Sequence, residues 1–245
     1  MRFPDPYALR RETPKETVLF AASQLTGKQG SQEDFFLNFN DECFVIADGV
    51  SDIPNGEVAA KLACETAIWA YKHIRQHRYY WLDKRLFMKR IYRTTNMTIW
   101  QKRREIGFEE GLATTLLVLM VGPQNIWIGN AGNSSAWLFH GGEIKRMTRE
   151  PAMEFEKIPS HILGIKRLGL VPEFSTSPFE AGDVLLLVTD GVGDYLTSND
   201  MLMSVASCGD KTEDIAGAVQ MLLTAASENG SEDNMTVLMV KRIGK

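Results

Sequence analysis

Acidic residues border four of the most apolar segments of this chain. In any fold that buries these segments, the acids must lie at the ends of the segments. Each segment is short and rich in aromatic or β-branched residues, which is typical of β-strands. Because a strand fixes the directions of its side chains, these acids take defined positions at strand ends. They are Glu33 and Asp34 before residues 35–39, Asp48 after 43–47, Asp190 after 184–189, and Asp233 before 235–240.

The remaining segments predict a layered α+β protein. Residues 57–76 repeat apolar side chains every three to four positions, which predicts an amphipathic helix, and Gly141-Gly142 predicts a hairpin turn. Strands at both ends of the chain with helix pairs between them favour one domain over residues 1–245. Further strands are expected over 18–24, 114–121, 126–128, 135–139 and 143–147, helices over 82–104, 198–207 and 212–227, and an irregular stretch over 151–178.

Composition excludes several classes of protein. The 245 residues are 44% hydrophobic, which is too apolar for a disordered chain. Three widely separated cysteines argue against a disulfide scaffold and against a Cys-rich zinc site. Charges and prolines stand where a signal peptide needs an apolar run, and the longest apolar stretch, residues 113–122, is too short to cross a membrane. We expect a cytoplasmic protein without a membrane segment.

The bordering acids have two interpretations. If they gather, they repel one another unless a cation neutralises them, and all-oxygen ligands favour Mg²⁺ or Mn²⁺ over zinc. An Asp-Gly pair after a strand is also common turn chemistry, which Asp48-Gly49 and Asp190-Gly191 satisfy equally well. From these residues alone, a divalent metal site and a set of structural turns both stay open.

Six segments, four of which contain these acids, follow one another along nearly the whole chain. They are QGSQED at 29–34, FVIADGVSD at 44–52, GLATT at 111–115, GNAGNSSAW at 129–137, LLLVTDGVGDYL at 185–196 and DNMTV at 233–237. In this order they resemble the motifs of the metal-dependent serine/threonine protein phosphatases of type 2C, the PPM family, in a compact bacterial form. The resemblance implies a four-layer αββα sandwich of two antiparallel β-sheets flanked by helix pairs.

The resemblance also implies a metal centre and an activity. Two ions, Mg²⁺ or Mn²⁺, would lie at one edge of the sandwich, and a water that bridges them would attack the phosphorus of phosphoserine or phosphothreonine in a signalling protein. Asp48, Asp190 and Asp233 would be the catalytic acids. The implied metal-binding positions are Asp48 between the two ions, the Gly49 carbonyl, Asp190, Asp233, and Glu33 and Asp34 around metal-bound waters.

Three positions depart from the family pattern. Gln29 occupies the position of the family's phosphate-binding Arg. Phosphate binding would then depend on Gln29 and the neighbouring Lys28, whose ammonium group is a point charge without the bidentate geometry of a guanidinium. Asn133 replaces an Asp that binds a third ion, which predicts a weak or absent third site. Asp52 replaces a Gly and is either a ligand or an outward turn residue. These changes leave an alternative open, a catalytically weakened member that binds phosphoproteins or a signalling partner.

Residues 72–104 form a strongly basic segment, with eleven Lys or Arg residues and one acid, Asp83, against a net charge of −4 for the whole chain. Amphipathic helices with solvated cationic faces explain it most simply, and a docking surface for an acidic protein partner is the main alternative. A nucleic-acid site is disfavoured. His73 and His77 have helical spacing, but in a basic helix they predict surface residues rather than metal ligands.

Overall fold

Two antiparallel β-sheets form the centre of the protein in the computed structural model, which describes residues 17–28, 30–77, 83–149 and 161–244. The strand orders are β1-β10-β9-β6-β7 and β2-β3-β4-β5-β8. The strands are β1 (Thr17–Leu25), β2 (Asp34–Phe39), β3 (Cys43–Asp48), β4 (Leu116–Val121), β5 (Asn125–Ala131), β6 (Ser135–His140), β7 (Glu143–Arg146), β8 (Glu173–Pro178), β9 (Val184–Val188) and β10 (Met235–Ile243). The helices are α1 (Gly56–Ile74), α3 (Lys84–Lys102), α4 (Asp190–Gly193), α5 (Ser198–Ala206) and α6 (Thr212–Glu228).

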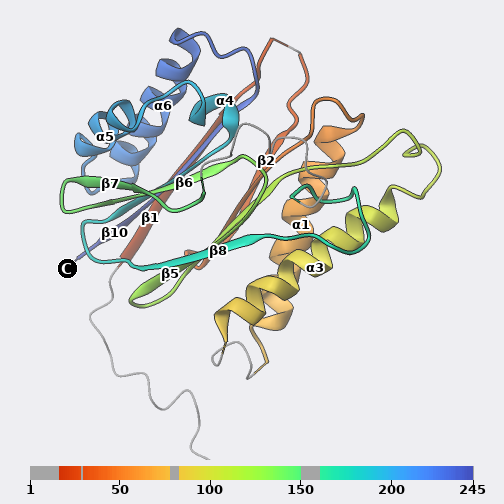
Figure 1. The fold of residues 1–245 in the computed structure, drawn as a ribbon. Helices are drawn as coiled ribbons and strands as arrows, with labels where there is room; N and C mark the ends of the chain where they lie inside the picture. The colour runs from red at the N-terminus through yellow and green to blue at the C-terminus, as the bar shows by residue number, and fades with distance from the viewer. Residues whose placement is uncertain (1–16, 29, 78–82, 150–160, 245) are drawn as a thin grey trace, which may run out of the picture.

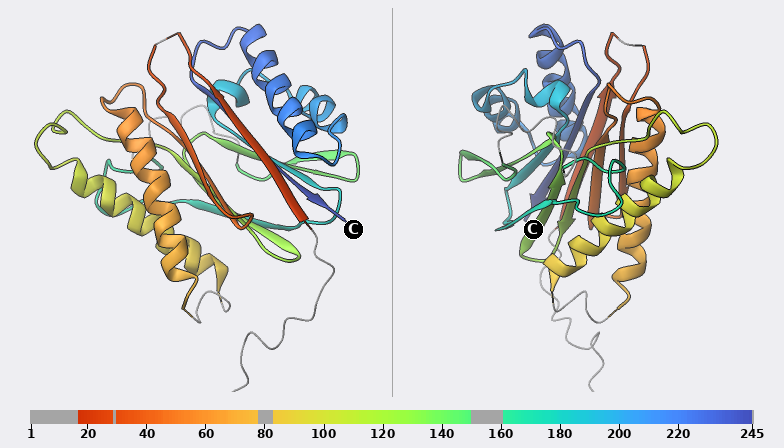
Figure 2. Two further views of the ribbon diagram at one scale, coloured as in Figure 1. Left: turned by 180° about the vertical axis from the view of Figure 1, so that it is seen from behind. Right: turned by 45° about the vertical axis from the view of Figure 1, so that its right-hand side comes forward.

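The sheets and helices stack in four layers (Figures 1 and 2). Helices α1 and α3 cover the outer face of the β2-β3-β4-β5-β8 sheet, and α5 and α6 cover the outer face of the other sheet. Three apolar cores follow from this arrangement, one under each helix pair and one between the sheets, where Phe44 and Leu117 of one sheet meet Leu187 and Leu238 of the other. The predicted αββα sandwich is confirmed.

Local sequence explains where several elements begin and turn. The Asp83 carboxylate accepts a hydrogen bond from the Leu86 amide at 2.9 Å and caps the first turn of α3. Gly141 and Gly142 join β6 to β7 with φ angles of +58° and +87°, the left-handed pair that a two-residue hairpin turn requires. Strands β3 and β4 lie inside their sheet, which explains their nearly unbroken apolar sequences.

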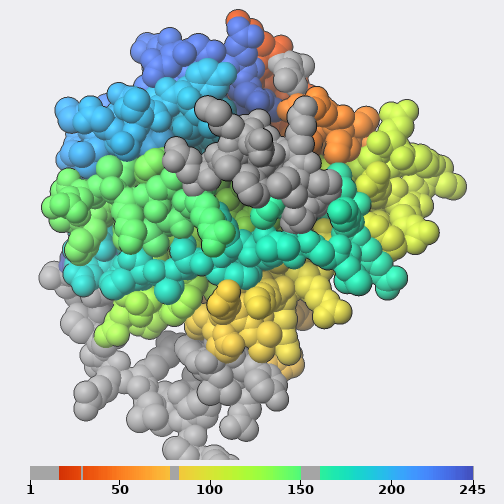
Figure 3. Space-filling view, in the orientation of Figure 1, coloured from red at the N-terminus to blue at the C-terminus, as the bar shows by residue number. Residues whose placement is uncertain are grey.

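Strand β8 corrects one prediction, because the stretch expected to be irregular contains it. Its sequence, EFSTSP, is mostly polar and ends in proline, since β8 is an edge strand that pairs only with β5. Figure 3 shows this strand on the surface, with the chain that precedes it, residues 161–172, extending toward α3. None of the helices in the described part of the chain has the length and apolar character needed to span a bilayer.

Candidate functional site

Four aspartates that lie far apart in the sequence meet at one end of the sandwich. Asp34 begins β2 and Asp48 ends β3, and the antiparallel register places these two residues directly opposite each other. Asp190 follows β9 at the start of α4, and Asp233 precedes β10 in the other sheet. Electrostatic interactions connect Asp48 with the other three. The strand ends of both sheets therefore gather the predicted acids into one cluster.

Asp34 connects the two sheets within this cluster. Its side chain is buried, and its Oδ2 accepts hydrogen bonds from the Thr189 hydroxyl at 2.8 Å and from the Thr236 hydroxyl at 2.6 Å. Both threonines belong to the opposite sheet's strand ends, and Thr189 Oγ1 also accepts from the Thr236 amide at 3.0 Å. These bonds fix the distance between the sheets at the site.

Hydrogen bonds to their backbone atoms hold Asp48 and Gly49 in place. Thr115 Oγ1 accepts from the Asp48 amide at 3.0 Å, and Thr114 Oγ1 donates to the Asp48 carbonyl at 2.7 Å. The Gly49 amide donates to the Glu33 carbonyl at 3.1 Å. A Cβ on Gly49 would lie 2.4 Å from the Cα of Gly56, so that only glycine allows the chain to pass the start of α1 here.

Asp190 and Asp233 lie on two segments that contact each other closely. The Asn133 amide group, on the loop that crosses from β5 to β6, donates to Asp190 Oδ2 at 2.7 Å, and Asp190 Oδ1 accepts from the Gly191 amide at 2.7 Å. The Ser231 hydroxyl donates to the Gly191 carbonyl at 2.7 Å. These contacts hold the turn after β9 against the turn before β10.

Burial and crowding raise the pKa values of Asp34, Asp48 and Asp190 in the absence of a cation. Burial, together with the charges of neighbouring carboxylates, raises the pKa of Asp34 to about 7 and that of Asp190 to about 6. Burial, followed by the charges of Asp190, Asp34 and Asp233, raises the pKa of Asp48 well above its ordinary value. Burial also raises the pKa of Glu33. Full ionisation of the cluster at neutral pH therefore requires a compensating positive charge.

Without divalent cations, the protein should lose stability as the pH rises. An aspartate in the unfolded chain titrates near pH 4, so that between about pH 4 and pH 7 the folded state holds the protons of Asp34 and Asp190 that the unfolded state has released. Stability is therefore full below this range and falls as the pH rises through it. We expect the Tm of chelator-treated protein to be about 5 to 10 °C lower near pH 8 than near pH 5. Thermal denaturation followed by circular dichroism measures this, and an unchanged or higher Tm near pH 8 would contradict it.

The donor set of the cluster fits a hard divalent cation. Its candidate ligand atoms are carboxylate oxygens and the carbonyl oxygen of Gly49, and Mg²⁺ and Mn²⁺ prefer oxygen ligands of this kind. Asp34 Oδ1 and Asn133 Oδ1 are buried and accept no hydrogen bond from any described residue. Within the described ranges, no group of three or more His, Cys, Asp or Glu side chains has the close spacing of a formed metal site. Cation binding would therefore draw the carboxylates closer together.

Some predicted residues lie apart from the four aspartates. Glu33 is half-buried and contacts Gly56 at the start of α1, and the charge of Asp233 acts on it. Lys28 is exposed, forms an ion pair with Glu232 at 2.6 Å, and does not line the cleft described below. Gln29 lies outside the described residues. Asp52 is exposed in the turn between Val50 and Ile53.

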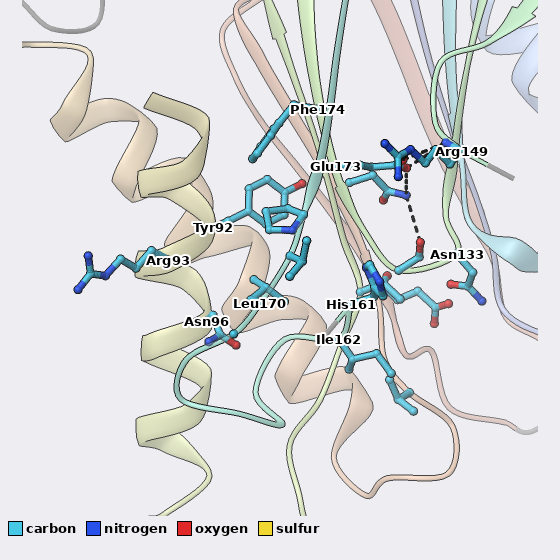
Figure 4. A pocket seen from close by; sticks show the side chains of 18 of the residues that line it. Tyr92, Arg93, Asn96, Asn133, Arg149, His161, Ile162, Leu170, Glu173 and Phe174 are labelled. Atoms are coloured by element: carbon cyan, nitrogen blue, oxygen red, sulfur yellow. Dashed lines mark hydrogen bonds and ion pairs between the residues drawn. The ribbon is translucent and has the colours of Figure 1, made fainter. Parts of the chain in front are cut away.

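A cleft of about 1280 Å³ opens beside the cluster (Figure 4). Asp48, Asp190 and Asn133 line one end of it, and Asp52 also contributes to the lining. Figure 4 shows Tyr92, Arg93 and Asn96 on α3 at the far side, with Arg149 and Glu173 on the strand side. The cleft is large enough for an extended peptide segment to reach the acids.

The sequence patterns did not identify the polar side chains that hold the acids and a neighbouring loop in place. Thr189 and Thr236 bind Asp34 from across the sandwich, and Asn234 holds the loop after β1 by accepting from the Gly27 amide at 2.9 Å and donating to the Ser31 carbonyl at 3.0 Å. Their only signal in the sequence is that each stands within three residues of a predicted acid. A polar residue inside an apolar strand and next to such an acid is the pattern that could have found them.

The fold is an αββα sandwich with an acidic cluster at one end, where the strand ends of both sheets meet. The chain belongs to the protein phosphatase 2C family, whose sequence profile it matches over residues 23–227. It is 23% identical over 223 residues to the serine/threonine phosphatase stp of Listeria welshimeri, covering 83% of this chain and 85% of that protein. It is 28% identical over 163 residues to the protein phosphatase PhpP of Streptococcus pneumoniae, covering 57% of this chain and 63% of that one. The predicted family is confirmed, and with it the class of enzyme, protein serine/threonine phosphatase.

Solved structures show the same fold. The catalytic domain of the phosphatase PstP in complex with 2 manganese ions superposes with a TM-score of 0.74 at 20% identity, covering 93% of this chain and 99% of that one. The serine/threonine phosphatase Stp1 from Staphylococcus aureus gives a TM-score of 0.75 at 20% identity, covering 93% and 96%. Family membership and the manganese-bound neighbour support dependence on a divalent metal ion.

Proposed function

We propose that this protein hydrolyses phosphoserine and phosphothreonine in phosphorylated proteins, with two divalent cations held at the acidic cluster. The observation that carries the proposal is the convergence of Asp34, Asp48, Asp190 and Asp233 from both sheets at the end of a cleft. The weakened-regulator alternative is not favoured, because every acid implied for the two-ion centre is present and the family is one of phosphatases.

Each residue of the cluster has a proposed role that follows from its position. Asp48, which interacts with the other three aspartates, would hold the cations together with the carbonyl of the next residue, Gly49. Asp190 and Asp233 would bind from the opposite sheet, and Glu33 and Asp34 would orient water. Bound cations would offset the negative charge of the cluster, activate a water for attack on phosphorus and stabilise the charge on the phosphoryl oxygens. The hydroxyls of Thr189 and Thr236 hold the Asp34 side chain in place, which supports its proposed role.

Asn133 should limit the site to two ions. Its amide group donates to Asp190 Oδ2, so that a neutral donor occupies the place where a further carboxylate would attract a cation. Asn133→Asp should add a negative charge beside Asp190 and raise the number of bound Mn²⁺ ions per protein by about one at millimolar metal. Equilibrium dialysis with metal analysis measures the number. An unchanged number in a variant that keeps the wild-type fold would contradict this role.

Hydrolysis of a phosphothreonine peptide tests the proposed activity. We expect phosphate release with added Mn²⁺ or Mg²⁺, no release with excess chelator, and recovery when the metal is restored. The release of inorganic phosphate from the purified protein measures this. Release that persists in excess chelator, or no release with either metal, would contradict the proposal.

A further inference from the structure

The cleft beside the acidic cluster has a basic wall that the proposed chemistry does not use. Arg85, Lys89 and Arg93 are spaced four residues apart on α3, so they lie along one face of the helix. All three are exposed and line the cleft. Arg167, on the segment that leads to β8, lines it as well, and its guanidinium lies over the Trp100 ring at 5.5 Å.

The charges of this wall are not neutralised from within the cleft. Among the described residues, no acid forms an ion pair with Arg85, Lys89 or Arg93. The acidic residues that line the cleft are Asp48, Asp52 and Asp190 at its catalytic end and Glu173. Glu173 accepts hydrogen bonds from the Arg149 amide at 3.0 and 3.2 Å and lies 3.7 Å from its guanidinium, as the dashed lines in Figure 4 show.

The cleft is therefore polarised, with its acids at one end and cations along α3. Eight residues of helix separate Arg85 from Arg93, about 12 Å, which matches three to four residues of an extended peptide. Leu168 and Val171 add exposed apolar surface, with 64% and 58% of each residue accessible, to the same lining. A substrate whose phosphorylated side chain reaches Asp48 and Asp190 would have its neighbouring residues beside the basic wall.

We propose that the basic wall selects phosphoserine and phosphothreonine substrates that carry additional acidic residues beside the phosphorylated one. Arg85, Lys89, Arg93 and Arg167 are the specificity-determining residues, and they act by charge complementarity with the substrate. This inference rests on the proposed phosphatase function and names its substrate class. It gives a role within the active-site cleft to part of the basic segment between residues 72 and 104.

Two phosphothreonine peptides test the selectivity, one with several aspartates on both sides of the phosphothreonine and one with asparagines in their place. With Mn²⁺ and low salt, the wild-type kcat/KM should be about tenfold higher for the aspartate peptide, because several weak ion pairs add up. In the variant R85Q/K89Q/R93Q the ratio should fall toward one. K61Q, which removes an exposed cation of α1 outside the cleft, should keep the wild-type ratio. The ratio should also fall between about 50 mM and about 500 mM NaCl.

Turnover of p-nitrophenyl phosphate separates the possible failures. Wild-type protein that hydrolyses this small ester and both peptides equally well would overturn the selectivity and leave the phosphatase function standing. Wild-type protein that hydrolyses none of the three would overturn both. If R85Q/K89Q/R93Q loses turnover of the ester as well, the single variant R93E must still lower the peptide ratio, and an unchanged ratio would overturn the proposal. Tighter binding of a fluorescent single-stranded oligonucleotide than of the aspartate peptide would also overturn it.

Discussion

Asp48→Asn should lower kcat for a phosphothreonine peptide by roughly 10³-fold or more at saturating Mn²⁺. Asp48 lies opposite Asp34 in the sheet register and interacts electrostatically with all three other aspartates of the cluster, so no other carboxylate can take its central position. The substitution keeps the size of the side chain but removes its charge. Steady-state phosphate release, with the metal concentration varied, separates weaker metal binding from a lower rate at saturation.

Asp52→Asn is the matched control for this prediction. Asp52 is also an acid that lines the cleft, but it is exposed in a turn. We expect its kcat to stay within about threefold of the wild-type value, as for a surface substitution. Equal losses in the two variants would show that charge in the cleft as a whole matters rather than a defined metal centre. A wild-type rate in Asp48→Asn would contradict the proposed role of Asp48.

Gly191→Ala should damage the site without removing a charged group. A Cβ on Gly191 would lie 2.1 Å from the carbonyl oxygen of Asn234, a backbone atom that cannot move aside alone. Accommodating the methyl group must therefore separate the turn that carries Asp190 from the turn that carries Asp233. We expect kcat/KM to fall by about 100-fold, because displacements near 1 Å have this effect in active sites. The Tm should fall by roughly 5 °C from overpacking.

Gly217→Ala makes the same chemical change at a position with free space. Gly217 lies within α6, and a Cβ there would have no heavy atom within 4 Å apart from its chain neighbours and its own helix. Alanine favours the helix by about 0.5 to 1 kcal/mol, so we expect a Tm about 2 °C higher and unchanged activity. Gly191→Ala protein with wild-type activity and Tm would show that the two turns tolerate separation.

The sequence predicted the order of elements well because most of them have clear periodicity. Strands β3, β4 and β9 are apolar and interior, and α1 has an amphipathic pattern. Strand β8 was missed because an edge strand with the sequence EFSTSP lacks that apolar signal. Its existence depends on the partner strand β5, which a local pattern cannot reveal.

The acids of the site were predictable, but their supporting contacts were not. Asp34, Asp48, Asp190 and Asp233 each border an apolar strand, which is a local signal. The bonds from Thr189 and Thr236 to Asp34 span 155 and 202 residues of sequence, and only the packing of the two sheets brings them together. The basic segment was predicted as a surface feature, whereas its place on the wall of the cleft depends on how α3 lies beside residues 161–174.

A crystal of the protein grown with Mn²⁺ and measured at the manganese absorption edge tests the central proposal most directly. We expect two anomalous peaks at the end of the sandwich, both within ligand distance of Asp48 oxygens, with Asp190 and Asp233 completing the coordination of at least one ion. Peaks held by other residues, for example His73 and His77, or no peak beside Asp48 at millimolar Mn²⁺, would contradict it.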